Sequence, residues 1–216
     1  MAYVTEEYAT VCYVTEEYAT VWQSLAKHGY DDGTVDMSLL RKLASQGISE
    51  AMYNLGLAHD LGRGVEKDAT EAIEWYRKAA QQGLAEAQFT MGLTYHSGLR
   101  CAPVDYTIAA TWLRQAADLG HANAQLLLGR LYAASNEDDT AAYWYRRAAE
   151  QDITAAQIVL GNAYECEGGL EEAETWYARA VELGDMRAGP FLDNVRDKIS
   201  SDFTAEMLCA EYLAYG

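Results

Sequence analysis

Apolar and small residues recur along the chain at helical spacing, in two alternating kinds of segment. The first kind begins with alanine and ends with Leu-Gly or Met-Gly, and it occurs at residues 51–56, 87–92, 124–129 and 156–161. The second kind is centred on a tryptophan, at Trp75, Trp112, Trp144 and Trp176. Apolar positions that return every three to four residues predict amphipathic helices.

The tryptophan segments share a common ending. Each tryptophan is followed by tyrosine or leucine, and then by a pair of small residues such as Ala79-Ala80. Gly83, Gly120 and Gly184 close three of these segments, and Asp152 takes the glycine's place in the other. A glycine just past a helix accepts the positive φ of a helix stop, so each segment is expected to end there.

The two kinds of segment together define a repeating pair of antiparallel helices with one apolar side. One pair cannot bury that side alone, so successive pairs are expected to stack. The tryptophans and tyrosines are the expected core fillers, and the alanines and glycines the spaces that receive them. The pattern predicts an all-α fold.

The unit from Ser49 to Gly83 carries the fullest set of repeated residues. They are Leu55-Gly56, Gly62-Arg63-Gly64-Val65, Asp68, Ala72, Trp75-Tyr76, Ala79-Ala80 and Gly83. This set resembles the Sel1-like repeat, a subclass of the tetratricopeptide superfamily. The resemblance implies a right-handed α–α superhelix, a solenoid of antiparallel helix hairpins.

Four such repeats are predicted over residues 49–184. The second replaces the Gly-x-Gly-Val turn with a longer loop at residues 97–103, and the third and fourth shorten that loop. Residues 15–48 are interpreted as a degenerate first hairpin, because residues 41–47 copy the end of the next unit. Residues 185–216 are predicted to form capping helices, one over 186–198 and a last one over 202–215.

The N-terminus contains a near-identical decapeptide twice, at residues 2–11 and 12–21. Ten residues leave a helix about 80° short of whole turns, so both copies cannot pack alike in one helix. Residues 1–14 are therefore interpreted as an extension of recent or artificial origin. A docking tail rich in tyrosine and glutamate is the alternative.

Composition narrows the range of partners. The 216 residues include 33 acidic and 16 basic ones, which gives a net charge of −17. Such a surface repels phosphate backbones and attracts basic proteins, so a protein partner with a basic or amphipathic segment is expected and nucleic acid is not. The alternative is that the acidity only keeps the protein soluble.

No apolar run approaches the ~20 residues of a membrane span, and no secretory signal opens the chain, so a cytoplasmic protein is expected.

Residues with catalytic or metal-binding potential are scattered. The cysteines are far apart, and the histidines, His28, His59, His96 and His121, form no zinc-binding pair. His59 stands in the repeat's tyrosine position and is interpreted as half-buried structure. The acidic run at residues 136–139 is interpreted as a helix start, with a metal site as the alternative. No cofactor, no metal and no enzymatic activity are expected.

The resemblance implies that the first helix of each unit lines a concave face that binds a partner. Residues three before each Leu-Gly or Met-Gly glycine form a predicted apolar row, with polar and charged residues beside it. The predicted partner-binding residues are Glu50, Tyr53, Leu57, Asp60, Glu86, Phe89, Leu93, His96, Leu126, Arg130, Ile158, Asn162 and Glu165. Inter-repeat packing is the alternative role for Tyr53, Phe89, Leu126 and Ile158.

An adaptor or scaffold is the preferred function, and an immunity-type or antitoxin-type protein that neutralises a basic toxin or effector is the alternative.

Overall fold

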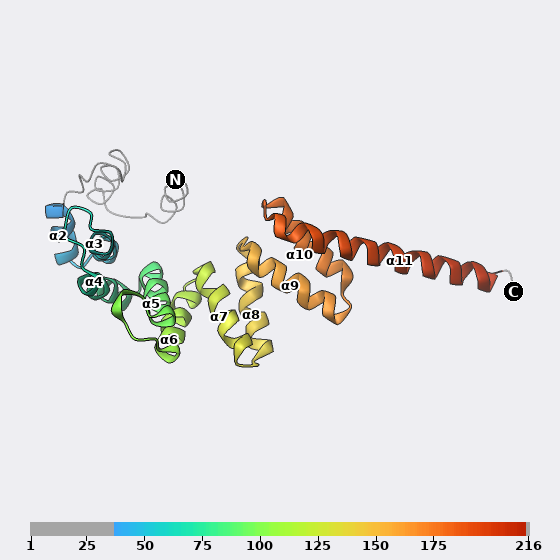
Figure 1. The fold of residues 1–216 in the computed structure, drawn as a ribbon, viewed down its shortest axis with the longest axis horizontal. Coiled ribbons are helices and arrows are strands. Elements are labelled where there is room, and N and C mark those ends of the chain that lie inside the picture. Colours follow the sequence, from blue (N-terminus) through green and yellow to red (C-terminus); the bar gives the residue numbers. More distant parts are fainter. Residues whose placement is uncertain (1–36, 215–216) are drawn as a thin grey trace. The chain divides into compact units, whose positions relative to one another are not determined.

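The computed structural model describes residues 37–214, with side chains described up to residue 201 except at residue 101. The described residues form ten α-helices and two short 3-10 helices, and they contain no strand (Figure 1). The N-terminal extension and the first helix of the degenerate hairpin fall outside the described residues. The predicted all-α fold is confirmed.

The helices follow the predicted repeat pattern. They are α2 (Met37–Ser45), α3 (Ser49–Leu61), α4 (Ala69–Gln81), α5 (Ala85–Ser97), α6 (Tyr106–Asp118), α7 (Ala122–Ala134), α8 (Asp138–Glu150), α9 (Thr154–Glu167), α10 (Leu170–Glu182) and α11 (Gly189–Ala214), with 3-10 helices η2 (Leu99–Cys101) and η3 (Met186–Ala188). We call α3, α5, α7 and α9 the first helices, and α4, α6, α8 and α10 the second helices. Each first helix is joined to its second helix by a loop, and these pairs are the four hairpins.

The chain divides into two compact units, Met1–Gln115 and Ala116–Gly216. The boundary falls inside α6. Unit 1 contains the first hairpin, α5 and most of α6, whereas unit 2 contains the third and fourth hairpins and α11. Each unit is described by itself below.

The predicted helix stops are confirmed by the backbone. Gly83, Gly120 and Gly184 have φ values of 87°, 94° and 89°, and Asp152 has a φ of 64°. Only glycine adopts such angles without steric cost, although aspartate tolerates them better than most residues. The tight turn between hairpins therefore follows from these four positions.

One backbone hydrogen bond closes the loop within every hairpin. The residue before each second helix donates its N–H to the carbonyl of the residue three positions after the repeat's glycine. The four pairs are Asp68 to His59 (2.9 Å), Asp105 to Tyr95 (2.9 Å), Glu137 to Tyr132 (3.0 Å) and Gly169 to Tyr164 (2.8 Å). Because a backbone carbonyl is the acceptor, His59 can replace tyrosine here without losing the contact.

The closest packing in each hairpin is between the first helix's glycine and the residue after the tryptophan. A Cβ placed on Gly56 would come 2.7 Å from the ring of Tyr76, and Gly129 and Tyr145 repeat the arrangement at 2.8 Å. In the second hairpin, Leu113 takes the place of the tyrosine and lies against Gly92. The prediction that glycines receive large side chains is confirmed for these positions.

The tryptophans occupy a more peripheral position than expected. Trp144 is buried, but Trp75 and Trp176 are half-buried, with Lys78 3.9 Å and Arg179 5.9 Å from their ring centroids. The residue after each tryptophan, a tyrosine in three hairpins and Leu113 in the second, fills the space between the two helices instead of the tryptophan. A basic residue three positions further on covers the outer face of these two indole rings, which is a favourable cation–π geometry.

A glutamine that follows the alanine of the first helix links consecutive hairpins. The Nε2 atoms of Gln88, Gln125 and Gln157 donate to the carbonyls of Ala80, Ala117 and Ala149 at 3.0–3.1 Å. These carbonyls lie in the last turn of the preceding second helix, and each also accepts the N–H of the residue that stops that helix, Gly83, Gly120 or Asp152. The buried glutamines therefore add a second donor to these helix ends and join them to the next first helix.

The C-terminal region differs from the prediction. The two helices expected over residues 186–198 and 202–215 are instead η3 and one helix of 26 residues, α11. Nothing in the sequence between Lys198 and Asp202 stops a helix. The hydroxyls of Ser200 and Ser201 donate to the carbonyls of Arg196 and Lys198 in the same helix, so both serines fit into its interior. The buried Leu192 and Val195 of α11 pack against α10, so its first half covers the last repeat.

Candidate partner-binding face

All of the predicted partner-binding residues lie on the first helices. Within each helix they are spaced three or four residues apart, which places them along one side. In unit 1 they are Glu50, Tyr53, Leu57 and Asp60 on α3, and Glu86, Phe89, Leu93 and His96 on α5; in unit 2 they are Leu126 and Arg130 on α7, and Ile158, Asn162 and Glu165 on α9.

The apolar row is largely packed between neighbouring helices. Tyr53 is buried in the core of unit 1, its ring lies 5.3 Å from that of Tyr76, and its hydroxyl meets Thr90 Oγ1 at 3.5 Å. Leu126 and Ile158 pack against the apolar clusters of unit 2. For these three residues the contacts match the alternative interpretation, inter-repeat packing. Their part in partner binding stays a prediction.

The other predicted residues, polar and apolar, differ in exposure and in their internal contacts. Arg130 and Asn162 are exposed, and Glu50, Glu86, Leu57 and Leu93 are half-buried. Asp60 and Glu165 hold internal hydrogen bonds and ion pairs. The structure therefore leaves a face with a half-exposed apolar strip, rather than a row of unengaged charges.

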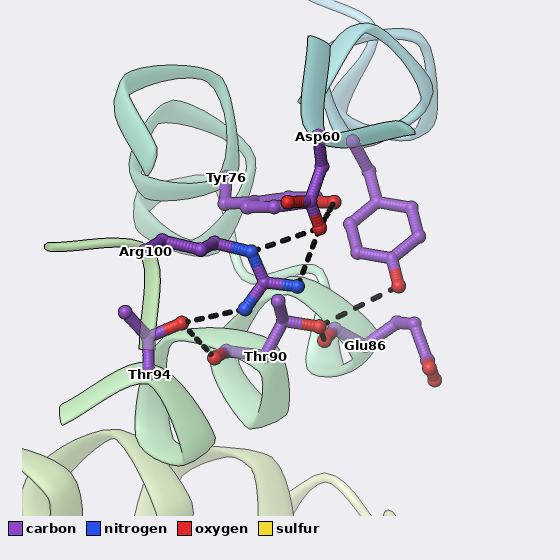
Figure 2. A network of polar contacts seen from close by, with 7 residues as sticks. Asp60, Tyr76, Glu86, Thr90, Thr94 and Arg100 are labelled. Atoms are coloured by element: carbon purple, nitrogen blue, oxygen red, sulfur yellow. Dashed lines mark hydrogen bonds and ion pairs between the residues drawn. The ribbon is translucent and has the colours of Figure 1, made fainter. Parts of the chain in front are cut away.

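Asp60 forms an ion pair with Arg100, a residue of the long loop in the second hairpin. The Arg100 Nη2 and Nε atoms donate to Asp60 Oδ2 at 2.6 and 2.9 Å, and its Nη1 donates to Thr94 Oγ1 at 3.1 Å (Figure 2). The guanidinium also lies 5.3 Å from the centroid of the Tyr76 ring. One arginine thus ties the loop of the second hairpin to both helices of the first.

This ion pair is partly withdrawn from water. The side chains of Arg100 and Asp60 are 20% and 17% exposed. Burial alone would lower the pKa of Arg100, but the hydrogen bond and charge of Asp60 outweigh that effect and raise it. Arg100 therefore remains a cation, and Asp60 is not available as an uncompensated charge for a partner.

The side of α5 that faces α3 carries two threonines whose hydroxyls bond to their own helix. Thr90 Oγ1 donates to the carbonyl of Glu86 at 2.9 Å, and Thr94 Oγ1 donates to the carbonyl of Thr90 at 2.8 Å (Figure 2). Each hydroxyl oxygen can still accept a hydrogen bond, and Thr94 accepts one from Arg100. The hydroxyls of Thr90 and Thr94 are therefore satisfied within unit 1.

Unit 2 contains a counterpart of this arrangement at Glu165, which stands four residues after Gly161 as Asp60 stands four after Gly56. The Tyr177 hydroxyl shares its one hydrogen between Asn162 Oδ1 at 2.6 Å and Glu165 Oε2 at 3.0 Å. Lys198 of α11 supplies the cation, with its Nζ 2.6 Å from Glu165 Oε1. The predicted site residue Glu165 thus helps to hold α11, whereas Asn162 contacts Tyr177 of α10.

The pKa values of this second cluster reflect these contacts. The hydrogen bond from Lys198 is the main cause that lowers the pKa of Glu165, and the hydrogen bond from Tyr177 adds to it. Burial, followed by the hydrogen bond to Glu165, raises the pKa of Tyr177. Both groups are held in the forms that the hydrogen bonds require, a carboxylate and a neutral phenol.

Two kinds of structural residue were missed from the sequence. The glutamines had a usable signal, since a polar residue recurs at the same position of three otherwise apolar segments. Arg100 had no such signal in the sequence, because it lies in a loop that no other repeat shares and its partner Asp60 is 40 residues away.

The part of the chain that the structure describes contains neither a cluster of potential metal ligands nor a membrane-spanning helix. No group of three or more His, Cys, Asp or Glu side chains is close enough there to hold a metal ion. Among the same residues, no helix has the length and apolar character needed to cross a bilayer.

Comparisons with known proteins agree with the repeat pattern. The Sel1 repeat family matches the chain four times, over residues 49–84, 85–121, 122–153 and 154–185. Among curated proteins, none matches the chain.

Several solved structures share the fold. A Sel1 repeat protein from Oxalobacter formigenes is 32% identical, with a TM-score of 0.62, over 73% of this chain and 66% of its own. A protective antigen present in uropathogenic Escherichia coli strains, which displays an SLR fold, is 34% identical, with a TM-score of 0.66, over 72% of this chain and 35% of its own. An immunity protein from Pseudomonas aeruginosa is 24% identical, with a TM-score of 0.55, over 84% of this chain and 72% of its own, and this likeness shows the fold alone.

The present chain therefore spans about two thirds of the first of these proteins and about a third of the second. Sel1 repeats generally serve as scaffolds for protein interaction. With four matches that together cover more than half of its residues, the chain belongs to the Sel1 repeat family.

Proposed function

We propose that this protein is an interaction module, an adaptor or scaffold without catalysis of its own, that binds a partner protein through its first helices. The observation that carries the proposal is the composition of the face in unit 1. Leu57 and Leu93 are half-exposed there, and Glu50 and Glu86 stand in the first turns of the same two helices. An apolar strip with carboxylates at one end suits a partner segment that has apolar anchors and a basic flank.

The charge of the chain supports the same type of partner. A net charge of −17 attracts a basic protein and speeds its association at low ionic strength. Because Asp60 is neutralised by Arg100, the attraction at this face comes from Glu50 and Glu86 rather than from Asp60. Binding is therefore expected to weaken as salt rises.

Charge reversal tests the proposal with a matched control. The full chain is used to capture its partner from the source cell, and the purified partner is then titrated against variants. Glu50→Lys with Glu86→Lys should weaken the Kd at least about tenfold, since each lost contact and each new repulsion costs on the order of 1 kcal/mol.

The control is Glu171→Lys with Glu172→Lys, which changes the net charge equally at the first turn of a second helix, α10. This control should change the Kd less than about threefold, because it alters only the long-range attraction. Equal losses in both variants would show that net charge, and not the first-helix face, governs binding.

A second candidate function is that of an immunity-type protein which masks a basic toxin or effector. The fold of the Pseudomonas aeruginosa immunity protein, shared over 84% of this chain, favours it as an alternative. Co-expression with a toxin encoded beside the gene tests it, and restored growth of the host would support it. Growth arrest despite a stably folded chain would exclude this function while leaving the adaptor function open. We propose a cytoplasmic location for the protein, which cell fractionation can test.

A further inference from the structure

The loop of the second hairpin exposes an unusual number of large apolar side chains. Leu99, Val104, Tyr106 and Ile108 are 46%, 53%, 61% and 39% exposed, and Leu61 at the end of α3 is 53% exposed. We call these five residues the loop-edge surface. Exposed apolar residues that are scattered singly need no explanation, but a group of them gathered in one place marks an interaction site.

Contacts within unit 1 bring most of this surface together. A Cβ placed on Gly98 would lie 2.9 Å from Val104 Cγ2, so Val104 folds back over the residue that precedes Leu99. The ring of Tyr106 meets His96 edge-on at 5.6 Å. Asp60, which comes just before Leu61 in the chain, is in direct contact with Arg100, which comes just after Leu99.

Hydrogen bonds hold the loop of the second hairpin against the helices of unit 1. Arg100 has a φ of 56°, an angle that is costly for a residue with a side chain, and its bonds to Asp60 and Thr94 compensate that cost. Backbone hydrogen bonds run from Ala102 to Leu99 and from Asp105 to Tyr95. The apolar side chains are therefore presented in a fixed arrangement, which reduces the entropy lost when a partner binds.

The other hairpins show that the fold does not require these residues. The corresponding loops of the third and fourth hairpins are shorter and polar, with Ser135-Asn136-Glu137 and Gly168-Gly169. They close with the same backbone hydrogen bond as the second hairpin does. The apolar residues of the long loop are thus an addition to a working hairpin.

Charge indicates what kind of segment would cover this surface. The ion pair of Asp60 with Arg100 cancels two of the nearby charges. The two loops and adjoining helix starts of unit 1 also carry Glu66, Asp68, Glu71 and Asp105 against Arg63 and Lys67. The surroundings are acidic, and with a net charge of −17 a second copy of the chain would be repelled.

We propose that the loop-edge surface docks a segment of the partner protein that carries apolar side chains flanked by lysine or arginine. This inference rests on the proposed function and extends it from the first helices to a second, adjoining surface. The apolar side chains of the segment would cover Leu99, Val104 and Tyr106. Its basic flanks would face the carboxylates of Asp105 and Glu66.

Peptide selection on the intact chain tests the inference without knowledge of the partner. A display library of random dodecapeptides is panned on the full chain, and enriched peptides are synthesised with a fluorescent label for anisotropy titration. Enriched sequences should combine apolar and basic residues. The variant Leu99→Ser with Val104→Ser should weaken their Kd at least tenfold, and circular dichroism should show unchanged helicity because both side chains are exposed.

The matched control removes two equally exposed leucines elsewhere, in Leu119→Ser with Leu183→Ser, which are 59% and 47% exposed in the native chain. It should change the Kd less than twofold. Failure to enrich any sequence, or unchanged affinity in the Leu99 and Val104 variant, would overturn the inference. If affinity falls instead in the variant Glu50→Lys with Glu86→Lys, the inference fails while the proposed function stands. Full affinity in the Leu99 and Val104 variant and in the Glu50 and Glu86 variant would overturn both the loop-edge surface and the first-helix face as binding sites.

Discussion

Gly161 lies so close to the ring of Tyr177 that a Cβ at position 161 would come within 2.5 Å of Cε1. The helices α9 and α10 approach each other at this point because no side chain separates them. The same relationship between a first-helix glycine and a second-helix ring recurs at Gly56 and Gly129. It is the contact that defines the hairpin.

The substitution Gly161→Ala should therefore destabilise unit 2. The ring of Tyr177 is buried and its hydroxyl is bonded, so it cannot move away without losing contacts. We expect a loss of about 1–3 kcal/mol, typical of overpacking. Urea denaturation followed by circular dichroism measures it.

Gly189→Ala serves as the control for that substitution. Gly189 begins α11 with helical angles, and a Cβ placed on it would have nothing from the described part of the chain packed within 4 Å. Alanine should be neutral or should stabilise the protein by up to about 1 kcal/mol, because it reduces the entropy of the unfolded chain. Similar destabilisation by both alanines would mean that the close approach at Gly161 is not what constrains the hairpin.

Asp60→Asn should destabilise unit 1 by about 1–3 kcal/mol, because it leaves Arg100 as a half-buried cation without its counter-charge. Asp152→Asn makes the same chemical change in a pair with Arg179 whose side chains are 54% and 41% exposed. That exposed pair should contribute less than about 1 kcal/mol. Thermal or chemical unfolding of the two variants gives the comparison, and equal losses would contradict the special role of the Asp60–Arg100 pair.

Leu183→Gln should stabilise the fourth hairpin. In the third hairpin, Gln151 Nε2 donates to Gln125 Oε1 at 2.7 Å. Leu183 occupies the position of Gln151 one repeat later, and the buried Gln157 Oε1 lacks a hydrogen-bond partner among the described residues. Supplying that donor should add about 0.5–1.5 kcal/mol. Leu183→Ala, which cannot reach Gln157, should give no gain, and a gain of equal size would refute the hydrogen-bond explanation.

Acid should loosen the packing of α11 through Glu165. Its pKa is lowered in the folded protein, mainly by Lys198, so the folded state favours the carboxylate. The resulting stability is fully present above the unfolded pKa of about 4.3 and is lost as pH falls through the lower folded value. Unfolding free energies measured from pH 7 to pH 3 should thus converge for the native chain and Glu165→Gln at low pH. A constant difference between the two across that range would contradict the ion pair's role.

The repeat pattern was sufficient to predict the hairpins, their loops and their glycine stops, because each depends on residues close together in the sequence. The residue that fills each hairpin was less predictable. Both Trp75 and Tyr76 are large and aromatic, and only the angle of the helix pair decides that Tyr76 meets Gly56.

The partner-binding face could be predicted only as far as the choice of helices. Spacing placed Tyr53 on the same side of α3 as Leu57, but its burial depends on the neighbouring α5 through Thr90. The engagement of Asp60 depends on an arginine in a loop with an unusual backbone angle, which no pattern of apolar residues reveals. Long-range pairs of this kind require the folded structure.

Photo-crosslinking can show whether the partner binds at the first helices. The photoreactive residue p-benzoylphenylalanine is placed at position 93 on α5, or at the exposed position 175 on α10 as a control, and each chain is irradiated with its captured partner. If the first helices bind the partner, position 93 should give a crosslinked complex that is lost in excess native chain, and position 175 should give little or none. Crosslinking from position 175 without any from position 93 would contradict partner binding by the first helices.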